Sequence, residues 1–332
     1  MLSRTADHLY WMARYTERAE NLARMLDVNS RMSLLPQGAE ILEQGWIATL
    51  TIIGLMDAFR QRYDAVTSSN VIEFMSFDRD NPMSIYSCLR AARENARAVR
   101  GTLTSEIWET LNATWLEMRD ASCWTGYSNA GNAGMRRTSL RSATEAEVGN
   151  FFEWVKYRSH VARGVIQGTM LRDEAWHFTW LGTYLERADS TARILDVKYH
   201  LLLPRGEQAG GATDYYQWSA LLHSVSAFEI YRRVYRDLIT PRRVAELLVL
   251  RDDMPRSLRR CMSQVHMHLE SVRNSQSAET ERRAGELQAS LHFGRIDSVF
   301  EVGLHEYLVR FLGQVRDLGD RVSRDFLVSA TD

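Results

Sequence analysis

The chain has 332 residues, of which 45% are hydrophobic and 25% are charged, and its formal net charge at pH 7 is −1. This near-neutral balance argues against a protein drawn electrostatically to nucleic acid or to an anionic membrane. No apolar run reaches about 18 residues, the length that a membrane-spanning helix needs. The three cysteines, Cys88, Cys123 and Cys261, are far apart and form no Cys-x-x-Cys pair, so neither a disulfide framework nor a zinc module is expected.

The first residues do not resemble a secretory leader, because Ser3, Arg4 and Asp7 stand where a charged and then apolar segment would begin. We therefore expect a soluble, cytoplasmic protein. Lys156 and Lys198 are the only lysines of the sequence, and neither lies in a Gly-x-x-x-x-Gly-Lys loop, so no Walker-type nucleotide site is expected.

The order of elements along the chain is that of an all-α protein, a helical bundle with no competing strand pattern. Residues 3–33 form one long expected helix, whose apolar side chains recur at helical spacing. Helix starts are indicated at Asn81, Ser142 and Thr240. The Gly-rich stretch 121–141 is expected to be a mobile loop. Further helices are expected near 40–62, 82–100, 104–120, 143–167, 170–203, 214–238, 240–250, 255–273, 279–291 and 298–328.

An internal repeat organises the chain. Residues 8–28 and 177–197 are identical at eleven of 21 positions, at an offset of 169. Residues 80–88 and 253–261 share Asp, Pro, Ser and Cys in register, at an offset of 173. Ordered matches at a nearly constant offset predict a duplication of a unit of about 170 residues. The expected repeats are 1–168 and 169–332, packed together as one domain.

The repeated segments carry a charged stripe opposite their apolar arc. In the first copy the stripe contains Glu17, Glu20, Arg24 and Asp27, and in the second Glu186, Asp189, Arg193 and Asp196. An exposed stripe of i,i+4 ion pairs is one interpretation. We favour a shielded stripe, because the order of charges is the same in both copies, and we expect Glu17, Arg24, Glu186 and Arg193 to meet beside one central cavity.

A shielded stripe has two interpretations that the sequence leaves open. Carboxylates and guanidiniums can pair across a helix crossing and hold the fold together. Alternatively, the carboxylates act as general acid and base while the arginines bind an anionic substrate. A second cationic stripe, made by Arg93, Arg97 and Arg100 with Asn95 between them, is a further candidate for binding carboxylate or phosphate, and pairing with acidic helix faces is its structural alternative.

A di-metal centre is not expected. Glu174 and His177 form a Glu-x-x-His step, but carboxylate-bridged di-metal bundles need two such steps. In the first copy Thr5 stands where the second has Glu174, and His8 falls on the apolar arc. We expect neither a bound metal nor a cofactor.

The segments around these motifs resemble the bacterial alpha-E domain family. The resemblance rests on MLSRTADHLYWMARYTERAENLARMLDV, RENARAVR and GTMLRDEAWHFTWLGTYLERADSTARILDVKYH, and it covers essentially the whole chain. It implies an all-helical protein associated with a circularly permuted ATP-grasp protein and a transglutaminase-like peptidase. The family motif implies as candidate functional positions Glu17, Arg18, Glu20, Arg24, Glu186, Arg187, Asp189 and Arg193.

Two functions remain open at this point. The first is a non-catalytic helical scaffold that binds an ATP-grasp amide ligase or its peptide. The second is an enzyme of the same pathway, in which the paired Glu/Arg centre performs acid–base chemistry on a peptide or amino-acid derivative. Neither function involves nucleic acid or a membrane.

Overall fold

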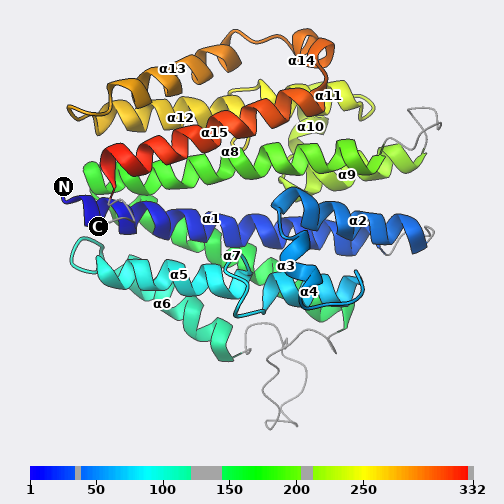
Figure 1. Ribbon diagram of the computed structural model, residues 1–332, viewed down its shortest axis with the longest axis horizontal. Coiled ribbons are helices and arrows are strands. Elements are labelled where there is room, and N and C mark those ends of the chain that lie inside the picture. The colour runs from blue at the N-terminus through cyan, green and yellow to red at the C-terminus, as the bar shows by residue number, and fades with distance from the viewer. Residues whose placement is uncertain (34–38, 121–143, 203–211, 328–332) are drawn as a thin grey trace. The chain divides into compact units, whose positions relative to one another are not determined.

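The structure, a computed structural model, describes residues 1–33, 39–120, 144–202 and 212–327 (Figure 1). Every regular element among these residues is a helix, which confirms the predicted all-α class. The expected loop 121–141 lies outside the described residues, as does Cys123. The chain divides into two compact units, one formed by Met1–Tyr10 with Asp173–Asp332 and the other by Trp11–Arg172.

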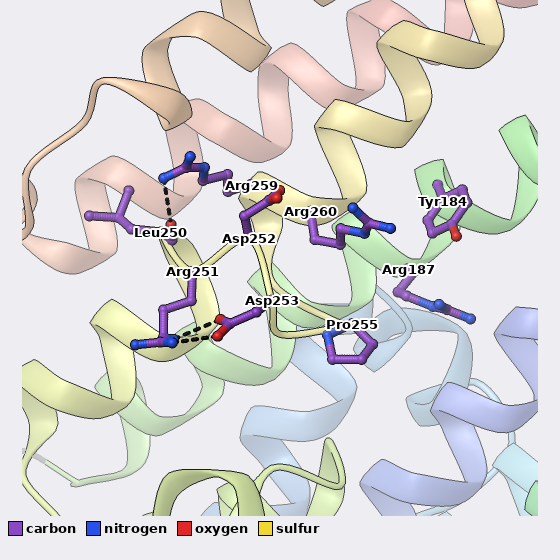
Figure 2. A pocket seen from close by; sticks show the side chains of 9 residues that line it. All are labelled: Tyr184, Arg187, Leu250, Arg251, Asp252, Asp253, Pro255, Arg259 and Arg260. Atoms are coloured by element: carbon purple, nitrogen blue, oxygen red, sulfur yellow. Dashed lines mark hydrogen bonds and ion pairs between the residues drawn. The ribbon is translucent and has the colours of Figure 1, made fainter. Parts of the chain in front are cut away.

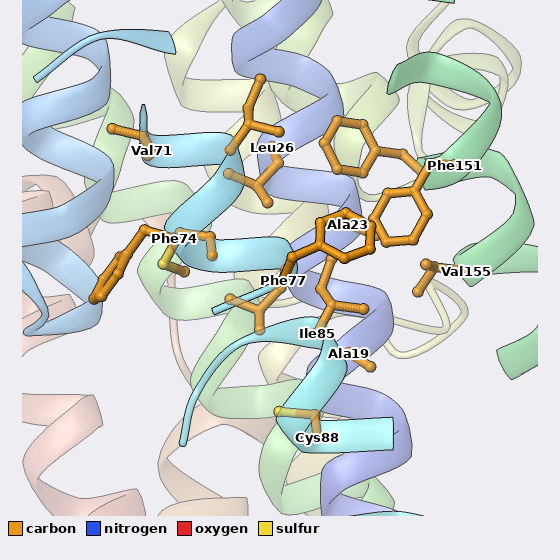
Figure 3. Close-up of a cluster of buried hydrophobic side chains, with 14 of the residues drawn as sticks. Ala19, Ala23, Leu26, Val71, Phe74, Phe77, Ile85, Cys88, Phe151 and Val155 are labelled. Atoms are coloured by element: carbon orange, nitrogen blue, oxygen red, sulfur yellow. The ribbon is translucent and has the colours of Figure 1, made fainter. Parts of the chain in front are cut away.

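The unit Trp11–Arg172 is built on most of α1. Side chains from α1, α4, α5 and α7 converge on one apolar cluster, in which Ala19, Leu26, Phe74 and Phe151 are buried (Figure 3). Small residues such as Ala19 let neighbouring helices approach α1 closely. The helices of this unit are α1 (Ser3–Met32), α2 (Ala39–Ile53), α3 (Met56–Arg60), α4 (Ser68–Ser76), α5 (Ile85–Ala98), α6 (Ser105–Asp120) and α7 (Glu145–Thr169).

The other unit is built on α8, against which α12 and α15 both pack. Leu181 and Leu185 of α8, Val265 of α12 and Leu308 of α15 are fully or almost fully buried in this unit. Its helices are α8 (Glu174–Leu202), α9 (Ala212–Ser224), α10 (Phe228–Tyr235), α11 (Pro241–Val249), α12 (Leu258–Ser271), α13 (Ala278–His292), α14 (Ile296–Val302) and α15 (Leu304–Phe326).

Three helices that the sequence predicts as continuous are interrupted. The expected helix 40–62 breaks at Gly54, 214–238 breaks at Ser226, and 298–328 breaks at Gly303. Each of these residues has a positive φ, which an α-helix cannot accommodate. The short helix α4 was not predicted; its first residues, Ser-Ser-Asn, are weak helix formers, and the helix begins where Thr67 caps it.

The turn that follows α2 in one unit has the same hydrogen bond as the turn that follows α9 in the other. The N–H of Leu55 donates to the carbonyl of Leu50 at 2.8 Å, and the N–H of Ala227 donates to that of Leu222 at 2.8 Å. The helices also correspond in length, with 30 residues in α1 and 29 in α8. Likewise, α5 and α12 each have 14 residues and begin after a serine N-cap.

We predict opposite effects for two alanine substitutions in the same unit. Gly54 has φ +80° and Gly45 lies inside α2, and a Cβ at either position would meet no atom within 4 Å. Gly54→Ala should lower the free energy of unfolding by about 1 kcal/mol, because the left-handed conformation disfavours any Cβ. Gly45→Ala should raise it by about 0.5–1 kcal/mol, through helix propensity. Urea denaturation measures both, and equal signs would contradict the assigned break at Gly54.

Candidate functional site

The charged stripe of α1 is shielded from solvent. Glu17 is 1% exposed, Glu20 is 0% and Arg24 is 5%, and Asp27 is also buried. Because Leu22 on the apolar side of α1 is buried as well, this helix is covered on both sides rather than amphipathic. The expected shielding is therefore found for the first copy of the stripe.

The partners of these carboxylates come from α7. Arg163 Nη1 lies 3.0 Å from Glu17 Oε2 and also forms an ion pair with Glu20. The backbone carbonyl of Thr16 accepts a hydrogen bond of 3.3 Å from the hydroxyl of Ser159. One guanidinium thus bridges two buried carboxylates that are three residues apart on α1, and it ties α7 to that face.

Glu20 lies at the centre of the network. Arg24 Nε donates to Glu20 Oε1 at 2.8 Å, and His160 Nε2 lies 3.4 Å from the same oxygen. The ring of His160 is also 3.2 Å from Arg24 Nη2, and 54% of its side chain is exposed. His160 therefore connects the buried carboxylate with solvent.

The network continues to the surface along the two helices. Lys156 Nζ lies 2.9 Å from Asp27 Oδ2, and Arg31 Nε lies 2.8 Å from Asp27 Oδ1. Arg31 and Glu153 are exposed and 3.2 Å apart. The ion pairs around Glu20 are buried, and the pair of Arg31 with Glu153 is exposed. Together these contacts form a ladder of charged side chains between α1 and α7.

Sequence reasoning missed the α7 side of this ladder. Lys156, His160 and Arg163 are spaced i, i+4 and i+7, which places them on one face of a helix. Lys156 and Arg163 supply cations on this face, and they pair with the carboxylates of the charged stripe of α1. This spacing can be read within the predicted helix 143–167. It lies outside the repeated segments of α1 and α8, so the repeat does not mark it.

In the second copy, Glu186 and Asp196 are buried, and Asp196 Oδ1 lies 2.7 Å from His305 Nδ1 of α15. Asp189 and Arg193 form a two-point ion pair, with Nε–Oδ2 at 2.6 Å and Nη2–Oδ1 at 3.1 Å. Their side chains are each 24% exposed, so this pair is less shielded than predicted. That the two copies meet beside one cavity stays a prediction.

In each Glu-Arg pair, the arginine contacts the tyrosine that stands three residues before it on the same helix. The guanidinium of Arg18 lies 5.4 Å from the centre of the Tyr15 ring, and that of Arg187 lies 5.5 Å from the Tyr184 ring. Arg18 also donates to the sulfur of Met83 at 3.3 Å. These distances fit cation–π contacts.

Of the second cationic stripe, Arg93 and Arg97 lie on α5 and Arg100 follows its end at Ala98; these arginines contact α5 itself and α6. Arg93 pairs with Glu94, and its Nε donates to Asn112 at 3.1 Å. Arg97 lies 3.6 Å from Glu94, while the guanidinium of Arg100 stacks on the Trp108 ring at 5.3 Å. The fourth candidate, Asn95, donates its amide to the carbonyl of Ala91 at 2.8 Å.

The Glu-x-x-His step does not assemble a metal site. Glu174 pairs with the amino group of Met1, whereas His177 Nδ1 lies 3.0 Å from His268 Nδ1 of α12. In the part of the chain that the structure describes, no group of three or more His, Cys, Asp or Glu side chains is arranged to hold a metal ion. The expectation of a metal-free protein stays a prediction.

A cavity of about 690 Å³ opens beside the start of α12 (Figure 2). It includes Arg187, one of the candidate substrate-binding residues, and the loop between α11 and α12 forms much of its wall. This cavity is not predicted from the sequence, although part of its loop belongs to the repeated segment 253–261. Its lining residues are Tyr184, Arg187, Leu250, Arg251, Asp252, Asp253, Pro255, Arg259 and Arg260.

We predict that the α1–α7 network is essential for stability. Arg163→Met should lower the free energy of unfolding by about 3–5 kcal/mol, because it leaves two buried carboxylates without their shared cation. The control is Arg31→Met on the same helix as those carboxylates; its side chain is 63% exposed, so the cost should stay below about 1 kcal/mol. Thermal and urea unfolding distinguish these outcomes, and equal costs would contradict a structural role for the network.

A double substitution tests the same network by its coupling. Arg24→Ala should be strongly destabilising, because Glu20 would lose a cation that contacts it at 2.8 Å. Glu20→Gln combined with Arg24→Met should be milder than Arg24→Ala alone, since no charge is left unpaired between them. Additive costs in a double-mutant cycle would show that the two side chains do not act as a pair.

The two contacting histidines predict a loss of stability in acid. Burial, followed by the nearby His177, lowers the pKa of His268 to about 3, and burial also lowers the pKa of His177. In the unfolded chain both rings regain a pKa near 6.5. Stability from the neutral pair is therefore complete above about pH 6.5 and falls as the pH drops toward 3, by up to about 1.4 kcal/mol per unit for His268.

His268→Gln should flatten this slope between about pH 6.5 and 4.5, whatever its effect at neutral pH. His223→Gln, at an exposed position of the same unit, should leave the slope unchanged. Urea denaturation across that range provides the measurement. If the unfolding free energy of the His268 variant falls with pH as steeply as that of the wild type, burial of His268 is not the cause of the acid sensitivity.

None of the helices in the described residues combines the length and hydrophobicity that a membrane crossing requires. Residues 1–327 match the model of the Alpha-E family, described as "A predicted alpha-helical domain with a conserved ER motif". Two Glu-Arg pairs, Glu17–Arg18 and Glu186–Arg187, stand at equivalent places on α1 and α8.

The curated relatives are uncharacterised proteins. One from Mycobacterium bovis and one from Mycobacterium tuberculosis are each 24% identical over 338 residues, covering 96% of this chain and 36% of the relative. The chain thus spans about a third of the length of the curated relatives it matches. No solved structure matches it. With the family match extending over residues 1–327, this all-helical chain belongs to the Alpha-E domain family.

Proposed function

We propose that this chain is a helical accessory domain that acts as a non-catalytic partner of an ATP-grasp amide ligase. The observation that carries the proposal is the buried network around Glu20. Arg24 and Arg163 both pair with its carboxylate, and Arg163 also pairs with Glu17. Carboxylates held between fixed guanidiniums suit a structural crossing better than proton exchange with a substrate. On this basis the Glu/Arg motif specifies a rigid scaffold.

The lengths of the relatives support a partnership. The matched region makes up 36% of each, so almost two thirds of those chains lies outside the helical domain. In the relatives, the helical domain is therefore joined covalently to other sequence, as expected for a domain that works beside another. The chemical class of the partner, an ATP-grasp ligase with a transglutaminase-like peptidase, comes from the family resemblance, and a peptide is the ligand that this class implies. ATP-dependent ligation would place the chain in the cytoplasm.

We further infer that the two units arose by duplication. The support is the ordered sequence repeat together with matched turns: Gly54 and Ser226 both have positive φ, and Thr67 and Thr240 both cap the helix that follows. A duplicated scaffold offers two related surfaces, of which one can diverge for binding.

The alternative function, an acid–base enzyme acting on a peptide or amino-acid derivative, is favoured by one specific observation. His160 is 54% exposed and contacts the buried Glu20 at 3.4 Å. A carboxylate behind an accessible imidazole can orient it as a general base. In this alternative, His160 exchanges the proton and Glu20 positions the ring.

The two functions are separated by assaying the purified chain with and without the circularly permuted ATP-grasp protein of the same genome. For the accessory role we expect co-elution in size-exclusion chromatography and a higher rate of ADP release by the ligase, unchanged by His160→Ala. Absence of both effects would overturn the accessory role. Hydrolysis of a peptide panel by the chain alone, lost in His160→Ala with the melting temperature retained, would establish the enzyme instead.

A further inference from the structure

The cavity beside α12 has an excess of positive charge. Its lining contains four arginines, Arg187, Arg251, Arg259 and Arg260, against two aspartates. Arg251 is neutralised within the lining, because its Nε donates to Asp253 Oδ1 at 2.8 Å. Apart from this ion pair and from Arg187, which is buried and has contacts of its own, the lining presents Arg259 and Arg260 against the single exposed carboxylate of Asp252.

The remaining arginines differ in how they are held. Arg259 Nη1 donates to the carbonyl of Leu250 at 3.3 Å, and its Nη2 lies 3.1 Å from His292 Nδ1, so this guanidinium is held by the fold. Arg260 is half-buried, and its guanidinium makes no hydrogen bond or ion pair with any residue that the structure describes; its backbone N–H donates to the hydroxyl of Ser257 at 3.0 Å. Figure 2 shows Arg260 extending to the same side as Tyr184 and Arg187, whereas Arg251 turns toward Asp253.

We propose that this cavity binds a small organic anion through a carboxylate or phosphate group held by Arg260, with the buried Arg187 in the same wall. Arginine recognises both groups because its planar fork of N–H donors matches their oxygens. Arg260 is in the first turn of α12, a helix of 14 residues, whose N-terminal partial positive charge also favours an anion. The ring of Tyr184, on which Arg187 stacks at 5.5 Å, offers an aromatic wall.

The size of the cavity indicates an organic ligand rather than a simple ion. Its volume of about 690 Å³ lies within the usual range of small-molecule sites, roughly 300–1,000 Å³. Leu250 and Pro255 contribute apolar wall beside the charges, so a ligand with a short carbon chain and one anionic end fits this lining.

The equivalent segment of the other unit lacks this chemistry. At the offset of 173, Ser87 stands where the second copy has Arg260, and its hydroxyl donates to the carbonyl of Arg79 at 3.3 Å. Tyr86 stands in place of Arg259. The two segments therefore share the same helix start, but of the two only the second has arginines at these positions. This binding site is independent of the accessory role proposed above.

Isothermal titration calorimetry on the full chain tests the inference with matched probes. Butyrate and glycerol phosphate present the two anionic groups, and butyramide and glycerol are their neutral counterparts. We expect saturable binding of at least one anion and none of its neutral counterpart. Which anion binds more tightly tells carboxylate from phosphate. Failure of both anions to bind would overturn the site.

Three variants assign the binding to these residues. Arg260→Ser, which introduces the residue of the other copy, should weaken binding at least tenfold. Arg316→Ser removes the same charge from an exposed position of α15 and should change nothing. Asp253→Asn should tighten binding several-fold, because it releases Arg251 toward the ligand. This opposite sign cannot come from misfolding. Wild-type affinity in Arg260→Ser, or equal loss in Arg316→Ser, would overturn the proposal.

Discussion

The structure of the unit Trp11–Arg172 depends on how two carboxylates are kept ionised inside it. Glu17 and Glu20 lie on a helix that is buried on both sides, where an unpaired charge would be prohibitively costly. Arg163 of α7 pairs with both carboxylates, and Arg24 supplies a second cation to Glu20. Since Arg163 and Glu20 are 143 residues apart in the sequence, their ion pair sets the register of α7 against α1. The apolar cluster around Phe74 and Phe151 adds burial free energy without fixing that register.

The two repeated segments differ in how much they shield their charges. The pair of Asp189 and Arg193 joins two residues of α8 and is partly exposed, while its counterpart in α1 is buried and shared with α7. The shorter Asp side chain holds its arginine from one turn away with two hydrogen bonds. In exchange, the second unit has an open, arginine-lined cavity at the start of α12. The first copy thus buries its i,i+4 ion pair, whereas the second leaves the equivalent pair partly exposed and has arginines at a cavity that a ligand can reach.

This division of roles agrees with a scaffold. A network in which each buried carboxylate already has a guanidinium partner provides rigidity, whereas the half-buried Arg260, whose guanidinium has no partner among the described residues, provides affinity for anions. His160 stands between the two cases, because it contacts Glu20 and is itself half exposed. If His160 only contacts Glu20, the network is purely structural; if its ring exchanges protons with a substrate, the network is catalytic. An imidazole ring is chemically suited to both roles.

The sequence by itself determined the helical class, most helix positions and the charged residues of α1 and α8, because helical periodicity and the repeat are local patterns. It did not reveal the breaks at Gly54, Ser226 and Gly303, since a positive φ in a short turn leaves little trace in hydrophobic spacing. Only the tertiary structure showed that Arg163 and His160 complete the α1 network, because pairing between distant helices depends on how they pack. For the same reason, the sequence could not predict the cavity at Arg260, because its wall combines residues of α8 with the loop before α12.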